Sequence, residues 1–315
     1  MTDATARFLT DLNRLSPGGR LGVAVSGGPD SLALLLLAAQ ACPDVVEAAT
    51  VDHQLRGGSA AEACRVADLC ARLGVRHTIL PVEVQPGASL QAQARTARYA
   101  ALASWAADRE LTLLTAHHAD DQAETLLMRL NRGAGLSGLA GVRATTEVTA
   151  GDGRTVRLLR PLLSWRKREL VELVALSGTK AADDPSNADP RHDRTRVRAL
   201  LASSDLVEPL AVAASASHLA DAEDALQFAV ATLASDRLAL DGQSALLAAG
   251  DLPRELQRRL LLAAMASLHA PIPRGPDLDR ALHRLQEGGS CTLSGLHLAG
   301  GKCWRLTREP PRRVQ

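Results

Sequence analysis

Aromatic side chains, long apolar runs and an excess of one charge are all missing from this sequence of 315 residues. Phe, Tyr and Trp make up only 2% of it, so a sheet that binds RNA by stacking bases on several aromatic rings is not expected. The longest apolar run, residues 32–39, is far shorter than a membrane span. Lys and Arg (36) nearly balance Asp and Glu (35), so binding to nucleic acid must rest on a local basic patch.

Cysteine is also sparse, and its spacing fits no ligand set. The five cysteines are Cys42, Cys64, Cys70, Cys291 and Cys303. No two form a CxxC pair, the odd number argues against a closed disulfide framework, and the spacing of Cys64 and Cys70 is unusual for zinc. We expect all five to be reduced structural residues. The first fifteen residues have no apolar signal core, so we expect a soluble, cytoplasmic protein without a membrane partner.

The first half of the chain alternates apolar, strand-like runs with longer helical stretches. Strands are predicted over residues 20–25, 45–51, 75–82 and 111–115, and helices over 30–41, 59–73, 90–109 and 119–132. This alternation predicts an α/β fold, a doubly wound parallel sheet with helices on both faces. Ligands of such sheets bind outside the carboxyl ends of the strands, which places the expected site there.

The second half differs in character. A glycine-punctuated loop follows residue 133, and then come a predicted strand (158–163) and a helix (165–176) with Ser164 as its N-cap. Residues 183–193 predict an exposed loop, and the pattern from about 194 to 268 is helical with a few breaks. One more helix and short strands follow. Length and 46% apolar residues predict two domains, a catalytic one over 1–204 and a smaller, mainly helical one over 205–315.

A glycine-containing motif joins the first predicted strand to its helix. It reads Ser26, Gly27, Gly28, Pro29, Asp30 and Ser31. The glycines allow positive φ and a close approach of backbone to a ligand, and the helix that follows offers free N–H groups suited to a phosphate. A tight βα turn capped by Asp30 or Ser31 is the alternative reading. The GxxxxGK[ST] pattern of a Walker A loop and the GxGxxG pattern are both absent.

Two other strand ends carry polar residues. Asp52 and His53 close the second predicted strand, and a run from Thr115 to Thr125 joins the fourth strand to the next helix. On that helix Asp121 and Glu124 are three residues apart and His117 precedes them by about one turn, so the three could face one pocket. The alternative makes Asp120 an N-cap and the other acids a solvated first turn, which leaves the two adjacent histidines unexplained.

The motif Ser26–Ser31 resembles the pyrophosphate loop of PP-loop ATPases, which cleave ATP between the α- and β-phosphates and leave an adenylate on the substrate. Five segments further resemble the tRNA(Ile)-lysidine synthetase family, in the family's order: SGGPDS, VDHQLRGGS, AHHADDQAETLLMRLNRGAGLSGLAG, RPLLSWRKREL and DPSN. The resemblance implies adenylation of the oxygen at C2 of the wobble cytidine of tRNA(Ile) with a CAU anticodon. The ε-amine of free lysine then displaces AMP, and the codon read changes from AUG to AUA.

The resemblance also implies roles for individual residues. Ser26, Gly27, Gly28, Pro29 and Ser31 would hold the pyrophosphate of ATP, with Asp30 placing Mg²⁺. Asp52 and His53 would line the nucleotide pocket. Asp121 and Glu124 would accept the lysine ammonium, and His117 would accept a proton. The residues implied for catalysis are therefore Asp30, His117, Asp121 and Glu124.

A basic stretch would meet the RNA. Residues 154–198 hold eleven Lys or Arg against six Asp or Glu. The residues expected to contact tRNA or lysine are Arg95, Arg98, Arg191, Arg194 and Arg198. Two departures from the family pattern are Gln91, where an acidic residue is usual, and Thr195, where Asn is usual. A PP-loop tRNA thiolase and a non-catalytic RNA-binding relative are the alternatives, and a homodimer is a further expectation.

Overall fold

The computed structural model describes residues 2–53, 59–83, 90–182, 193–204 and 206–308. The chain packs into two compact units, Met1–Ala220 and Asp221–Gln315. The division falls within one long helix, α9 (Pro209–Arg237). The domain boundary expected near residue 205 stays a prediction.

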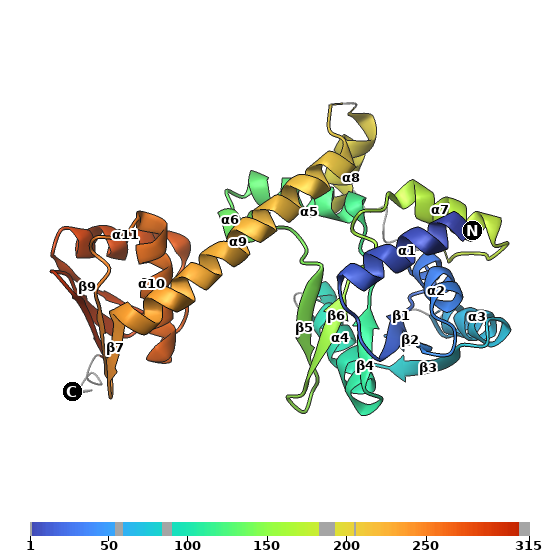
Figure 1. Cartoon of the computed structure of the whole chain (residues 1–315), viewed down its shortest axis with the longest axis horizontal. Coiled ribbons are helices and arrows are strands. Elements are labelled where there is room, and N and C mark those ends of the chain that lie inside the picture. Colours follow the sequence, from blue (N-terminus) through green and yellow to red (C-terminus); the bar gives the residue numbers. More distant parts are fainter. Residues whose placement is uncertain (1, 54–58, 84–89, 183–192, 205, 309–315) are drawn as a thin grey trace. The chain divides into compact units, whose positions relative to one another are not determined.

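The first unit is built on a six-stranded sheet in the order β3-β2-β1-β4-β6-β5 (Figure 1). All neighbouring strands are parallel except β5, which runs antiparallel to β6. The strands are β1 (Arg20–Ala24), β2 (Val46–Asp52), β3 (Arg76–Pro81), β4 (Leu111–Leu114), β5 (Thr145–Thr149) and β6 (Thr155–Leu159). The helices that precede α9 are α1 (Thr2–Arg14), α2 (Pro29–Ala41), α3 (Ser59–Arg72), α4 (Leu90–Asp108), α5 (Ala119–Asn131), α6 (Leu136–Leu139), α7 (Lys167–Leu176) and α8 (Asp193–Ser203).

The predicted α/β fold is confirmed, and each of the four predicted strand and helix pairs of the first half is present within one or two residues. The helix predicted from 165 begins at Lys167, with Arg166 and not Ser164 as its N-cap, because Glu169 reaches back to the backbone N–H of Arg166. The predicted loop 183–193 falls almost wholly outside the described residues. No helix in the described part of the chain is long and apolar enough to cross a membrane.

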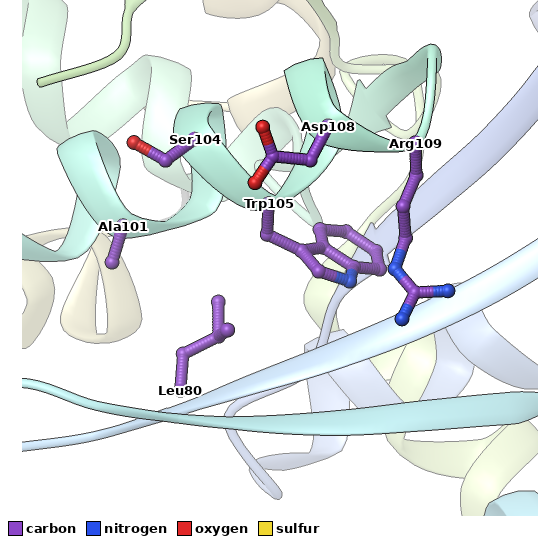
Figure 2. Close-up of a pocket in the computed structure, with 6 residues that line it drawn as sticks. All are labelled: Leu80, Ala101, Ser104, Trp105, Asp108 and Arg109. Carbon is purple, nitrogen blue, oxygen red and sulfur yellow. The ribbon is translucent and has the colours of Figure 1, made fainter. Parts of the chain in front are cut away.

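Alternating side chains of β1 face two different layers of helices. Leu21 and Val23 of β1, with Val25 directly after it, lie in a core with α1, α2, α3 and α7. The other face packs against α4, where Trp105 is buried. A Cβ atom at Gly22 would lie 2.7 Å from the Trp105 ring, so only glycine fits there without movement. Figure 2 shows Trp105 on the wall of a cavity of about 590 Å³ that includes none of the predicted site residues.

The second unit combines helices with a five-stranded antiparallel sheet. Its strand order is β7-β8-β11-β10-β9. The strands are β7 (Leu238–Asp241), β8 (Ser244–Leu247), β9 (Ser290–Leu293), β10 (Leu296–Ala299) and β11 (Trp304–Arg308), and the helices are α10 (Arg254–Ser267) and α11 (Gly275–Gln286). One core contains Trp304 and the apolar faces of both helices. The helical prediction was wrong at residues 238–247, which form a hairpin turning at Gly242 (φ 56°).

Candidate functional site

The motif Ser26–Ser31, called the phosphate loop below after the role expected of it, follows β1 at the carboxyl edge of the sheet. Its backbone is held by serines, because Ser31 Oγ accepts the Ser26 N–H (3.1 Å) and donates to the Gly28 carbonyl (3.0 Å). The two serine hydroxyls are also 3.2 Å apart. Gly28 is the N-cap of α2 without a side-chain cap, so the first N–H groups of α2 remain available to an anion. This arrangement fits a phosphate better than a plain capped turn.

Gly27 gives the loop its shape. Its φ of +85° lies in the left-handed region that glycine tolerates and other residues do not. Its carbonyl accepts a hydrogen bond from the Ala182 N–H (2.9 Å), so the segment after α7 is tied directly to the phosphate loop. Beside Gly27 lies a cavity of about 270 Å³, bordered by α3 and by residues 178–180 and 182. Space for a ligand group therefore exists next to the loop.

His118 connects the phosphate loop with α5. Its buried ring places Nε2 3.5 Å from Asp30 Oδ2, while Nδ1 accepts the Asp121 N–H and Asp121 accepts the His118 N–H in a capping box. Burial lowers the pKa of His118, but the hydrogen bond to Asp30 and the charges of Asp121 and Asp120 outweigh burial and raise it. The N-cap of α5 is therefore His118, and the alternative that gave Asp120 this role was wrong. Sequence reasoning had assigned His118 no role, although the adjacent histidines were its signal.

Asp120 joins two helices instead of capping α5. It accepts a hydrogen bond from the Lys167 N–H (2.7 Å) and pairs with Arg166 (3.3 Å), which links α5 to the start of α7. Burial raises the pKa of Asp120, and these hydrogen bonds more than offset it, so the carboxylate stays ionised. Arg166, one member of the basic stretch, is thereby held by Asp120 and also by Glu208 (2.6 Å).

His117 lies between the end of β4 and the start of α5, and its pKa is shifted in the opposite direction from that of His118. Burial lowers its pKa to about 4, and the positive charges of Arg160, Arg95 and Arg194 act in the same direction against Asp121. Its Nδ1 lies 3.2 Å from the Thr115 hydroxyl. The imidazole is therefore neutral near pH 7 and able to accept a proton.

The two acids expected to bind lysine are paired with two arginines expected to bind RNA. Glu124, with a side chain only 3% exposed, accepts Arg194 Nε (2.6 Å) and Arg198 Nε (2.8 Å). Asp121 accepts the other end of the Arg194 guanidinium at 2.8 Å. Both arginines lie on α8, which packs against α5. The structure thus brings all four residues together, and any cation that binds the acids must compete with these arginines.

The remaining predicted residues divide into three groups. Asp52 ends β2 and His53 follows it, and burial together with Arg98 lowers the pKa of His53. Arg95 and Arg98 lie on α4 beside Tyr99. Arg191 and the side chain of Gln91 fall outside the described residues, while Thr195 lies on α8.

Comparison with known proteins agrees with this geometry. A family profile described as a PP-loop domain matches residues 1–204. A tRNA(Ile)-lysidine synthase of Novosphingobium aromaticivorans is 50% identical over 99% of this chain and 96% of its own length. The same enzyme of Zymomonas mobilis is 44% identical over 94% and 90% of the two chains. This chain belongs to the tRNA(Ile)-lysidine synthase family.

A solved structure supports the fold independently. The U34-tRNA thiolase NcsA from Methanococcus maripaludis, described with its 4Fe-4S cluster, superposes with a TM-score of 0.54. It is 16% identical and covers 70% of this chain and 77% of its own. At this identity the likeness concerns the fold alone, and it agrees with the α/β fold described above.

Asp30 fits the role expected of a Mg²⁺ ligand. Its Oδ1 atom is buried and has no hydrogen-bond partner among the described residues, while Oδ2 faces His118. Mg²⁺ in nucleotide sites is held by one or two carboxylates together with phosphate oxygens, so a single carboxylate beside a phosphate loop is sufficient. The described residues contain no cluster of three or more His, Cys, Asp or Glu able to hold a metal without a substrate.

Proposed function

We propose that this chain modifies tRNA(Ile) with a CAU anticodon, using ATP to adenylate the oxygen at C2 of the wobble cytidine. The ε-amine of free lysine then bonds to C2, and the bond between C2 and that oxygen breaks as AMP leaves. AMP and pyrophosphate are released. The observation that carries the proposal is the meeting of the phosphate loop, Asp30 and the His117–Glu124 segment at one edge of the sheet, in a chain with the sequence of a lysidine synthase.

The first step belongs to the phosphate loop. Ser26 and Ser31 fix the loop, and Gly27, Gly28 and the start of α2 present backbone N–H groups to the pyrophosphate of ATP. Mg²⁺, when bound at Asp30, neutralises charge on the phosphate oxygens. His118 holds Asp30 in place through its Nε2. Asp52 and His53, at the end of the neighbouring strand, line the nucleotide pocket.

The second step needs lysine bound as an ammonium and then deprotonated. Asp121 and Glu124 supply the negative charge for binding. In the free protein Arg194 and Arg198 occupy these carboxylates, so lysine competes with α8 for them. Phosphates of the tRNA attract the same arginines and thereby free the acids. His117, neutral because burial lowers its pKa to about 4, accepts the proton that the amine loses.

The rival reading as a thiolase is not favoured. All five cysteines are free, and no CxxC pair exists to hold an iron–sulfur cluster. A non-catalytic relative is not favoured either, because Ser26–Ser31 and His117–Thr125 are both intact and assembled. A cytoplasmic location and a homodimer are kept as predictions.

The deciding experiment incubates the pure protein with ATP, labelled lysine and tRNA(Ile) with a CAU anticodon. We expect label in the tRNA and one AMP per lysine joined. The matched control is methionine tRNA, which carries the same anticodon and should take up no label. If lysine never enters the tRNA, the proposal fails, and AMP release with a sulfur donor instead would favour the thiolase.

A further inference from the structure

Three arginines gather around Tyr99 near His117. Arg95 and Arg98 lie on α4 with their guanidinium carbons 5.0 and 5.4 Å from the centre of the Tyr99 ring. Arg160, directly after β6, interacts with the same tyrosine and adds to the positive field at His117. The cluster therefore borders the reaction site on the side formed by α4 and β6, whereas the phosphate loop lies at β1 and α2.

Among the described residues, none of these three arginines forms an ion pair with a carboxylate. Arg160 is only 7% exposed and donates from Nη1 to the Arg143 carbonyl (2.6 Å) and the Thr146 hydroxyl (3.2 Å). Its Nε is buried and forms no hydrogen bond with a described residue. Arg98 is partly buried, and this burial lowers its pKa below the ordinary arginine value. The contrast with Arg194 and Arg198, which hold Glu124, is clear.

Arg160 is buried, Arg98 is partly buried and Arg95 is exposed, so the three run from the interior to the surface. Burying the Arg160 guanidinium without a carboxylate partner among the described residues costs free energy that an incoming anion restores. A guanidinium fork matches the oxygens of a phosphate, and several forks together favour a phosphate over a singly charged carboxylate. We propose that Arg95, Arg98 and Arg160 form a phosphate-binding site beside Tyr99, and that Arg160 is a substrate-binding residue. Sequence reasoning had assigned Arg160 no role.

The phosphate that binds this site has two candidate sources among the substrates. The first source is a phosphodiester of the RNA next to the modified nucleotide, and the second is a phosphate of the adenine nucleotide. The phosphate loop already supplies donors for a nucleotide, so a second site on the other side of His117 suits the RNA. The identity of that RNA rests on the proposed function, but the presence of the anion site does not.

The test measures binding without any ligation reaction. Arg160→Met and Arg98→Met are compared with wild type by calorimetric titration of an anticodon stem-loop RNA, of AMP, of inorganic pyrophosphate and of L-lysine. The matched control is Arg157→Met, since Arg157 lies on β6 but bonds to the Leu15 and Ser16 carbonyls away from the cluster. Arg98→Met decides if Arg160→Met does not fold, and circular dichroism checks both.

We expect RNA affinity to fall about tenfold in both cluster variants, with little change in the control. A similar loss confined to AMP or pyrophosphate also supports the site and identifies the nucleotide as its source. The inference is overturned if neither RNA nor nucleotide binding changes, or if only lysine binding weakens, since that would make the site a carboxylate pocket. Wild-type protein that binds RNA but joins no lysine would refute the proposed function and leave this result standing.

Discussion

At the scale of single residues, two adjacent histidines of the site have pKa values shifted in opposite directions by their surroundings. His117 and His118 are neighbours, yet burial among arginines lowers the pKa of the first and three carboxylates raise that of the second. Sequence alone identified the pair as unusual but could not divide their roles, because the partners come from elements far apart in the chain. Glu124 and Arg194, for example, are separated by 70 positions.

Replacing Glu124 by Gln tests the lysine pocket. The amide keeps the shape but loses the negative charge, so we expect the KM for lysine to rise about tenfold while the KM for ATP and the tRNA affinity stay close to wild type. Steady-state kinetics with each substrate varied in turn checks this. Glu172→Gln, an exposed position on α7, serves as the control. Unchanged lysine kinetics would remove Glu124 from the pocket.

Replacing His117 by Asn tests its protonation state. The folded-state pKa of about 4 lies below the unfolded value near 6.5, so the unfolded chain binds the proton more readily in this window. The stability contribution is complete above about pH 6.5 and is lost as pH falls toward 4. Between pH 7 and pH 5, denaturant unfolding of wild type should lose about 2 kcal/mol more than that of the variant. Equal pH dependence in both proteins would contradict the neutral assignment.

At the scale of elements, the sequence predicted the first unit well, since apolar runs such as β1 are followed by polar strand ends and by clear helix starts. It failed at β7 and β8, where Leu and Ala are good helix formers. These residues are strands because β8 pairs with β11 and β7 pairs with β8. The predicted start of α5 was correct, but sequence alone did not identify His118 as its N-cap, because histidine is not among the preferred N-cap residues.

The cap of α5 gives an element-scale prediction. In His118→Asn the amide oxygen still caps the helix, but the contact with Asp30 is lost. We expect near-normal thermal stability and a raised KM for ATP. His118→Ala loses both interactions and should in addition be less stable by about 1 kcal/mol. Thermal melting and ATP kinetics on both variants separate the two roles, and a normal KM for ATP in both would refute the link to Asp30.

At the scale of the whole molecule, the two units have separate apolar cores. No described residue belongs both to the cores of the first unit and to that of the second. Length predicts two domains, and the boundary expected near residue 205 stays a prediction. The two compact units divide within α9, a helix without an internal Gly or Pro signal.

Separate cores predict separate unfolding. Leu37→Ala in α2 and Leu282→Ala in α11 remove equally buried side chains, and each should cost about 2–5 kcal/mol. In scanning calorimetry we expect two transitions, with each substitution lowering a different one. A single transition lowered by both substitutions would mean that the units unfold together.

The contact between Gly22 and Trp105 has a consequence for how such sequences change over time. The indole ring occupies the place where a side chain at position 22 would begin. Neither position can vary alone without disturbing the layer between β1 and α4. In natural homologues the two positions should therefore vary as a pair, with a larger residue at 22 found only beside a smaller ring or an aliphatic side chain at 105.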